Sequence, residues 1–199
     1  MENNEKYLFL VVLGGRAPNA NIELHDVRWV IGSTIEETYD DLRKDWFGSI
    51  KGLHIDSYKK ISSIDGFKIN LKNKNTQYNH FSKKINLTKK LWFVNVGGYD
   101  PSCMQEKHEF GLVVAETSIE AKNKAKSKWL IGCKRKHKDD IACLKQFSDI
   151  DDCEVIKTIG NWEIELTLEN NCVEETTCPD WFGYMRIDED SEYKKRIED

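Results

Sequence analysis

The chain has 199 residues and a formal net charge of −4, with 39% hydrophobic and 32% charged residues. This composition fits a soluble globular protein with one ordinary domain or two small ones. The apolar opening run, residues 7–13, is too short to span a bilayer and lacks the flanking pattern of a signal peptide. We therefore expect a cytoplasmic protein without a membrane partner.

The first part of the chain predicts strand, strand, helix, strand and strand. Residues 8–13 are nearly all apolar, as in a buried strand, and residues 25–31 form the second predicted strand. Ser33 or Thr34 is expected to cap the helix that follows. The apolar face of that helix carries Ile35, Tyr39, Leu42 and Trp46. Residues 54–61 and 67–71 complete the pattern, joined by a hairpin turn at Asp65-Gly66.

The chain then repeats itself. Residues 8–58 align without a gap with residues 91–141, an offset of 83, and fourteen of the 51 positions are identical. Ordinary composition would give about three matches by chance. The match resumes where residues 61–71 resemble residues 156–166, so the second copy has about twelve extra residues before this point. The sequence therefore predicts a duplicated module.

The second copy is expected to fold like the first. Thr117 is placed to cap its helix, whose apolar stripe carries Ala121, Ala125 and Trp129. Residues 161–168 form its last predicted strand. Residues 179–185, which lie outside the repeat, are expected to pack as an arm.

We predict an α+β fold of two tandem ββαββ repeats, related by a pseudo-twofold axis, with helices packed on β-sheets. The first module spans residues 1–83, with a lysine-rich linker at 72–90, and the second spans residues 90–170. An acidic C-terminal extension, residues 171–199, follows them. Pairing of edge strands between the copies would remove the exposed edges of two small sheets.

All six cysteines lie at or after Cys103, and none is matched by a cysteine in the other copy. A secreted chain of this size would show a balanced disulfide framework, so we expect reduced, structural thiols. Cys172 and Cys178 give only a weak signal for a disulfide or a metal, because no CxxC motif accompanies them.

Several short motifs recur in both copies. The first copy has Gly14-Gly15 and Pro18, then Glu23-x-His25 and His54-x-Asp56; the second has Gly97-Gly98, Pro101 and His137-x-Asp139. This pattern resembles a bacterial family known as domain of unknown function 1543, over roughly residues 7–170. The resemblance implies one or two copies of the module in a small bacterial protein, and it supplies no activity, cofactor or catalytic residue.

Four of the five histidines form matched pairs, and each has a carboxylate two residues away. Residues two apart on a strand point to the same face, so these side chains can converge at neighbouring strand starts. We call the two groups the first corner and the second corner. The first corner is Glu23, His25, His54 and Asp56, and the second corner is Glu106, His108, His137 and Asp139. Imidazole and carboxylate together suit a divalent metal or an acid–base pair.

Two interpretations of the corners stay open. In the structural one, each histidine bonds to backbone groups and its carboxylate fixes the tautomer. In the functional one, a corner binds a ligand or substrate. Arg16 and Arg28 stand near the first corner, where the second copy has Tyr99 and Gly111, so an anionic ligand would favour the first copy. A metal site lacks the strong spacing of HExxH or of a Cys/His set, so the sequence identifies no metal.

Other motifs give weaker signals. Gly14-Gly15 lacks the GxGxxG or GxxxxGK[ST] context of a nucleotide loop, and a tight turn explains it better. The lysines at alternate positions of residues 122–128 spread around their helix, which indicates a solvated surface rather than a nucleic-acid face. No nucleophile motif such as GxSxG is present.

The sequence thus supports two functions. The first is a module that binds an unidentified small ligand or protein, in a groove between the copies. The second is a metal-dependent or acid–base hydrolase that uses the first corner. No cofactor or catalytic residue is identified, and assembly into a homo-oligomer stays open.

Overall fold

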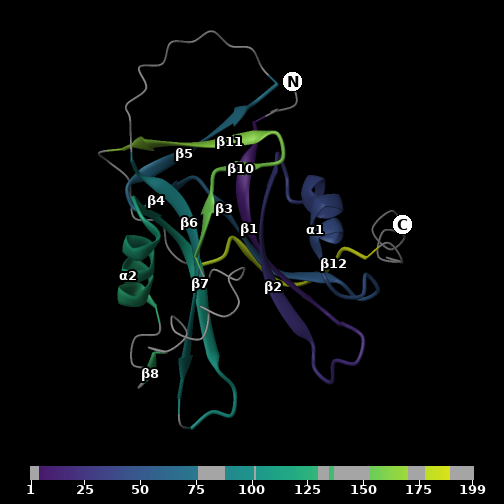
Figure 1. Cartoon of the computed structure of the whole chain (residues 1–199). Helices are drawn as coiled ribbons and strands as arrows, with labels where there is room; N and C mark the ends of the chain where they lie inside the picture. Colours follow the sequence, from purple (N-terminus) through teal and green to yellow (C-terminus); the bar gives the residue numbers. More distant parts are fainter. Residues whose placement is uncertain are drawn as a thin grey trace. The chain divides into compact units, whose positions relative to one another are not determined.

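The computed structural model describes residues 5–75, 88–100, 102–129, 135–136, 153–169 and 178–188 (Figure 1). The described part is mostly β-sheet with two short α-helices, which confirms the α+β class. Two compact units are formed, Met1–Ser62 with Glu175–Asp199 and Ser63–Glu174. These units are defined by contacts within the fold, whereas the predicted modules are defined by sequence similarity between the copies. The module boundaries therefore stay a prediction. Neither described helix is long and apolar enough to cross a bilayer.

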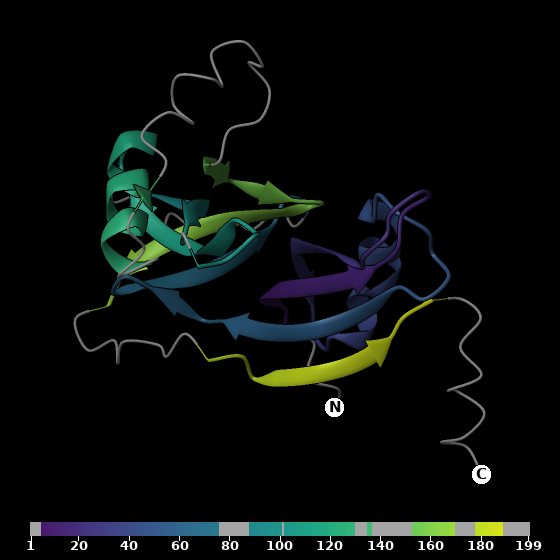
Figure 2. The ribbon, with the colours of Figure 1, turned by 90° about the horizontal axis from the view of Figure 1, so that it is seen from below.

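The first unit is built on one antiparallel sheet with the strand order β12-β3-β1-β2. Its elements are β1 (Tyr7–Gly15), β2 (Leu24–Gly32), a 3₁₀ helix (Glu36–Thr38), α1 (Tyr39–Asp45), β3 (His54–Ile61) and β12 (Trp181–Arg186). Figure 2 shows β12, in yellow, running along β3. The C-terminal segment expected to pack as an arm is therefore an edge strand of the first sheet.

Apolar side chains of β1 and α1 form the core of the first unit. Val11 and Leu13 on strand β1 are fully buried, and Leu42 of α1 and Trp46, which directly follows α1, pack into the same cluster. Full burial of a leucine side chain stabilises the fold by about 1.5–3 kcal/mol. The predicted helix face is thus the one that is buried.

Helix α1 also holds the C-terminal segment. Tyr39 Oη donates to Met185 Sδ at 2.8 Å, and Arg43 Nη1 donates to the Ile187 carbonyl at 2.8 Å. Partial burial of the phenol raises the pKa of Tyr39 to about 12. These contacts anchor β12 and the residues after it, which matter for the first corner.

The predicted cap of the first helix is wrong. The 3₁₀ helix starts after Ile35, and neither Ser33 nor Thr34 caps it with its side chain. The Ser33 amide donates to Glu37 Oε2 at 2.7 Å. The chain enters the helix through a tighter 3₁₀ turn, in which the Thr38 amide and the Thr38 hydroxyl both donate to the Ile35 carbonyl, at 3.0 Å and 2.7 Å.

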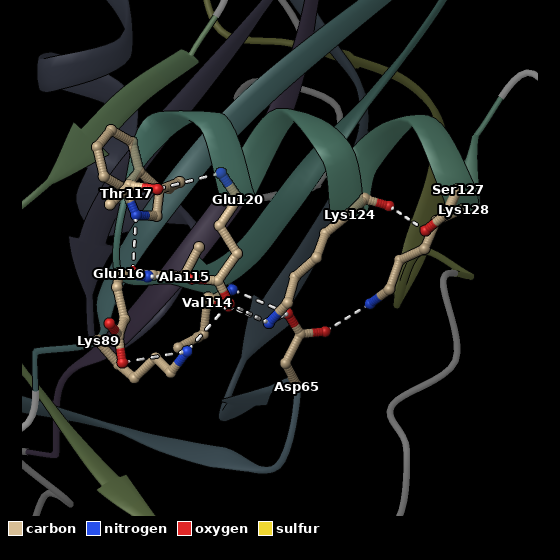
Figure 3. Close-up of polar contacts among 11 residues, drawn as sticks. Asp65, Lys89, Val114, Ala115, Glu116, Thr117, Glu120, Lys124, Ser127 and Lys128 are labelled. Carbon is tan, nitrogen blue, oxygen red and sulfur yellow. Dashed lines mark hydrogen bonds and ion pairs between the residues drawn. The ribbon is translucent and has the colours of Figure 1, made fainter.

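The predicted cap of the second helix, α2 (Ser118–Lys128), is confirmed. The Glu120 amide donates to Thr117 Oγ1 at 3.2 Å, and the Glu120 carboxylate accepts the Glu116 amide at 2.8 Å (Figure 3). This second bond repeats the Ser33–Glu37 bond of the first copy. The hydrogen bond from the Glu116 amide is the main reason that the pKa of Glu120 is lowered.

An ion pair recurs at the same place in both copies. Lys6 Nζ lies 2.6 Å from Glu37 Oε2, and Lys89 Nζ lies 3.0 Å from Glu120 Oε1. The lysines are 83 residues apart, the offset of the repeat, but both fall just outside the aligned segment. The duplication therefore extends further toward the N-terminus than the alignment predicted.

The second unit contains two sheets. In the first of them β7 (Lys107–Ala115) pairs with β6 (Lys90–Tyr99), and β8 (Arg135–Lys136) and β9 (Cys153–Ile156) pair with the other side of β6. Helix α2 packs on this sheet through Ala121 and Ala125, which are fully buried (Figure 1). The small side chains let the helix lie close to the strands. The extra residues expected between 142 and 155 lie mostly outside the described residues, which resume at Cys153.

The second sheet joins strands from both copies. It consists of β4 (Ser63–Ile64), β5 (Phe67–Asn73), β10 (Thr158–Ile159) and β11 (Trp162–Leu168), in the order β10-β11-β5-β4. Strand β5 pairs antiparallel with β11, and Asn70 lies opposite Glu165. These two residues are also equivalent in the repeat alignment, so the copies pair through corresponding strands.

The β4–β5 hairpin is tied to α2 by Asp65. The turn has the positive φ angles of a type I′ hairpin, 52° at Asp65 and 80° at Gly66. Asp65 Oδ2 accepts the Val114 amide at 2.9 Å, and Oδ1 lies 2.5 Å from Lys128 Nζ (Figure 3). Lys124 Nζ lies 3.8 Å from Oδ2. Two of the helix lysines are therefore engaged inside the unit.

Replacing this aspartate should loosen the second unit. Asp65→Ala removes the acceptor of the Val114 amide and leaves a residue without a polar side chain at positive φ, so we expect a loss of about 1–3 kcal/mol. Amide hydrogen exchange of β7 measures it. Asp65→Asn keeps an acceptor and tolerates this φ angle, and it should recover part of the protection. Equal protection in wild type and Asp65→Ala would contradict this role.

Candidate functional site

One row of residues crosses the first sheet at the level of the first corner. Gly14 on β1 lies opposite His25 on β2 and opposite His54 on β3, and His54 lies opposite Arg186 on β12. Directly opposed residues share a face of the sheet. The row therefore places two imidazoles on either side of a residue without a side chain.

The lack of a side chain at Gly14 leaves space for the His54 ring and the Asp56 carboxylate. A Cβ atom at this position would lie 2.4 Å from His54 Nε2 and 3.0 Å from Asp56 Oδ2. Such distances are far below van der Waals contact, so no other residue type fits without a shift of the ring. The Gly-Gly motif thus has a packing role here, as a close approach of side chains to the backbone.

Asp56 reaches the corner because of a β-bulge. The register between β1 and β3 shifts at this point, with Val12 opposite Ser57 and Leu13 opposite Ile55. Asp56 is the extra residue, and bulges commonly redirect a side chain beside a functional site. Its carboxylate bridges the two imidazoles, with Oδ1 at 3.2 Å from His54 Nε2 and Oδ2 at 3.2 Å from His25 Nε2.

Glu23 completes the first corner from the residue before β2. Its Oε1 lies 3.6 Å from His54 Nε2. The exposed fractions of the side chains are 1% for His54, 29% for Asp56, 41% for Glu23 and 56% for His25. A buried imidazole therefore lies at the base of a group that is open to solvent on its outer side.

The second nitrogen of His54 is fixed by the backbone. Nδ1 lies 2.9 Å from the Gly52 carbonyl oxygen, which can only accept, so Nδ1 carries the hydrogen and Nε2 faces the carboxylates. The ring also stacks against Tyr184 of β12, with 3.9 Å between centroids and 31° between planes. His54 is thus held in one orientation from two sides.

The C-terminal segment supports this arrangement through Gly52. The Gly52 amide donates to Asp188 Oδ2 at 2.9 Å, and Arg186 Nη2 lies 2.6 Å from the same oxygen. Gly52 has φ of +84°, which favours glycine. The hydrogen bonds from Arg186 are the main reason that the pKa of the buried Asp188 is lowered, against the opposing effect of burial.

The second corner is seen only in part. Glu106 Oε2 lies 3.7 Å from His108 Nε2, and a Cβ on Gly97 would lie 2.3 Å from Glu106 Oε1. Asn95 Nδ2 lies 3.4 Å from His108 Nδ1. The other two residues predicted for this corner, His137 and Asp139, lie outside the described residues. The glycine gap of the first corner therefore recurs in the second.

The arginines near the first corner do not bond to it. Arg16 is exposed, and its carbonyl accepts the Ser49 amide at 2.6 Å. Arg28 Nη2 lies 2.5 Å from Asp26 Oδ2 and donates to the Asp45 carbonyl. Within the described ranges, no group of three or more His, Cys, Asp or Glu side chains is arranged to hold a metal ion.

The repeat pattern did not predict several residues that support the first corner. Tyr184, Arg186 and Asp188 belong to the C-terminal extension, which has no counterpart in the duplicated segments. Gly52 precedes the His54-x-Asp56 motif, but its backbone role depends on Asp188. A composition pattern cannot show such a contact, since it joins residues 136 positions apart.

Comparison with known proteins supports the duplication. The family model described as Domain of Unknown Function (DUF1543) matches residues 20–71 and 103–155. The crystal structure of a protein Il1583 from Idiomarina loihiensis is 33% identical in sequence, with a TM-score of 0.64, and the match covers 92% of this chain and 99% of that chain. None of the curated proteins compared with the chain matches it.

Proposed function

Because the chain belongs to the family Domain of Unknown Function (DUF1543), whose description assigns no activity, we propose from the geometry that it is a small-ligand-binding module with its site at the first corner. The observation that carries this proposal is the convergence of Asp56 and Glu23 on the buried His54, over the gap left by Gly14, with His25 bonded to the other oxygen of Asp56. A purely structural histidine needs one partner for each ring nitrogen, whereas Nε2 of His54 faces two carboxylates at a solvent-facing position.

The duplication supports a site in each copy. The pairing of Asn70 with Glu165, which are equivalent in the repeat, favours the pseudo-twofold relation of the two ββαββ repeats at this strand pair. The glycine at 97 and the Glu106–His108 pair repeat half of the first corner. We place ligand binding in the first copy, where Asp56 bonds to His25 and His54 and Glu23 lies beside His54.

A thermal-shift screen of small molecules tests the proposal. His25→Gln removes an exposed imidazole of the first corner, and His108→Gln removes its equivalent, which is exposed to a similar degree, 51% against 56%. Compounds that bind at the first corner should raise the melting temperature of wild type and His108→Gln but not of His25→Gln. Hits that stabilise all three proteins equally would overturn the proposal.

An acid–base hydrolase is the second candidate. It is favoured by the fixed tautomer of His54, whose Nε2 faces Asp56 while Nδ1 donates to Gly52. The discriminating observation is turnover of ester or phosphoester substrates that is lost in His54→Gln. A metal-dependent form additionally requires stoichiometric metal in the purified protein, lost in His25→Ala, and a chelator that lowers the melting temperature.

A further inference from the structure

Hydrogen-bond acceptors dominate the first corner. Because His54 Nδ1 donates to the Gly52 carbonyl, Nε2 is the ring nitrogen that faces the carboxylates. It lies 3.2 Å from Asp56 Oδ1 and 3.6 Å from Glu23 Oε1. An ionised carboxylate only accepts and has about four lone-pair sites, so the two carboxylates can accept further donors or a positive charge.

Two arginines of the first unit are engaged elsewhere. Arg28 bonds to Asp26 and to the Asp45 carbonyl, and Arg186 bonds to Asp188. In the part of the chain that the structure describes, no lysine or arginine forms an ion pair with Glu23 or Asp56. Among these described residues the partners of the two carboxylates are imidazoles, so the corner attracts a positive group.

We propose that the ligand of the first corner carries a primary ammonium group, an inference that rests on the proposed binding function. An ammonium has three N–H donors and no acceptor, which suits the carboxylate oxygens of Asp56 and Glu23. This class replaces the anionic ligand expected from Arg16, whose exposed side chain has no contact with the corner among those described.

The surroundings of His54 fit an organic cation. The ring of Tyr184 stacks on His54 and is 62% exposed, so it offers an aromatic face at the edge of the corner. Aromatic faces attract cations and pack against the carbon chain that carries them.

In the second corner Asn95 stands where the first copy has Val12, and its amide lies against His108. The first corner is therefore the one suited to an ammonium.

A matched pair of probes tests the ligand class. n-Butylammonium and 1-butanol have the same carbon chain and differ in the head group, and each is titrated into the ¹⁵N-labelled full chain at neutral pH. Butylammonium should shift the amides of Gly14, His25 and His54 in a saturable way, and butanol should not. Asp56→Asn should weaken this binding by at least about ten-fold.

Two further variants keep the test decisive. Glu23→Gln removes the other carboxylate and should also weaken binding, whereas Glu106→Gln, its equivalent in the second copy, should leave the titration unchanged. Equal shifts with both probes, or no saturable shift with butylammonium, would overturn the ammonium assignment. Compounds from the thermal-shift screen whose binding depends on His25 would still support the proposed binding function in that case. The two experiments therefore distinguish a wrong ligand class from a wrong binding site.

Discussion

Gly14→Ala is expected to destabilise the first unit by about 1–3 kcal/mol, the usual cost of extra volume in a packed interior. The new methyl group would lie 2.4 Å from His54 Nε2, and any shift of the ring costs its contacts with Tyr184 and the Gly52 carbonyl. The ring must therefore rotate or the strands must separate. Either change breaks the contacts of His54 with Asp56.

The equivalent change in the second copy is the matched control. In Gly97→Ala the methyl group would meet the end of the Glu106 side chain, which is 27% exposed and can rotate toward solvent. We expect a clearly smaller loss of stability there. Amide hydrogen exchange, read separately for β1 and β6, measures both. An equal loss in the two variants would show that His54 is not rigidly held.

Asp188→Ala is expected to lower the stability of the first unit by about 2–3 kcal/mol, since it leaves the Gly52 amide and the Arg186 guanidinium without their buried acceptor. The loss of the Gly52 contact should also release His54, whose resonances should broaden or shift. Asp180→Ala is the control, because Asp180 accepts the Lys60 amide near the start of β12 and does not touch Gly52. A similar response of His54 in both variants would argue against a positioning role for Asp188.

The same carboxylate gives the first unit an acid-sensitive contribution. Hydrogen bonds from Arg186 lower the pKa of Asp188 in the folded chain, so its stabilisation is complete above the unfolded value of about 3.9 and is lost as the pH falls through the lower folded value. Asp188→Asn should show less acid destabilisation than wild type. Urea unfolding at neutral pH and below pH 4 provides the comparison.

The first corner could be predicted from the sequence because its parts are local and repeated. His25 and His54 each have a carboxylate two residues away, and both motifs recur in the second copy. The expected strand starts then predicted where these side chains would meet. The tight turn expected at Gly14-Gly15 is wrong, because both glycines lie in β1. The structure brings all four residues of the first corner together, and their role as a ligand site stays a proposal.

Other features depend on contacts that no local pattern reveals. The bulge that places Asp56 results from a register shift between β1 and β3. Strand β12 joins the first sheet across more than a hundred residues, so Tyr184 and Asp188 gave no signal. The serine and threonine before the first helix matched a capping box, but that helix begins with a 3₁₀ turn after Ile35, where the Thr38 hydroxyl donates to the Ile35 carbonyl.

The most direct measurement is a crystal structure of the chain with the compound that stabilises it most in the screen. We predict electron density for that compound within hydrogen-bonding distance of Asp56 and His25, with His54 in the orientation set by Gly52 and Tyr184. Density elsewhere, with the four side chains of the first corner bonded only to one another, would contradict the proposed site.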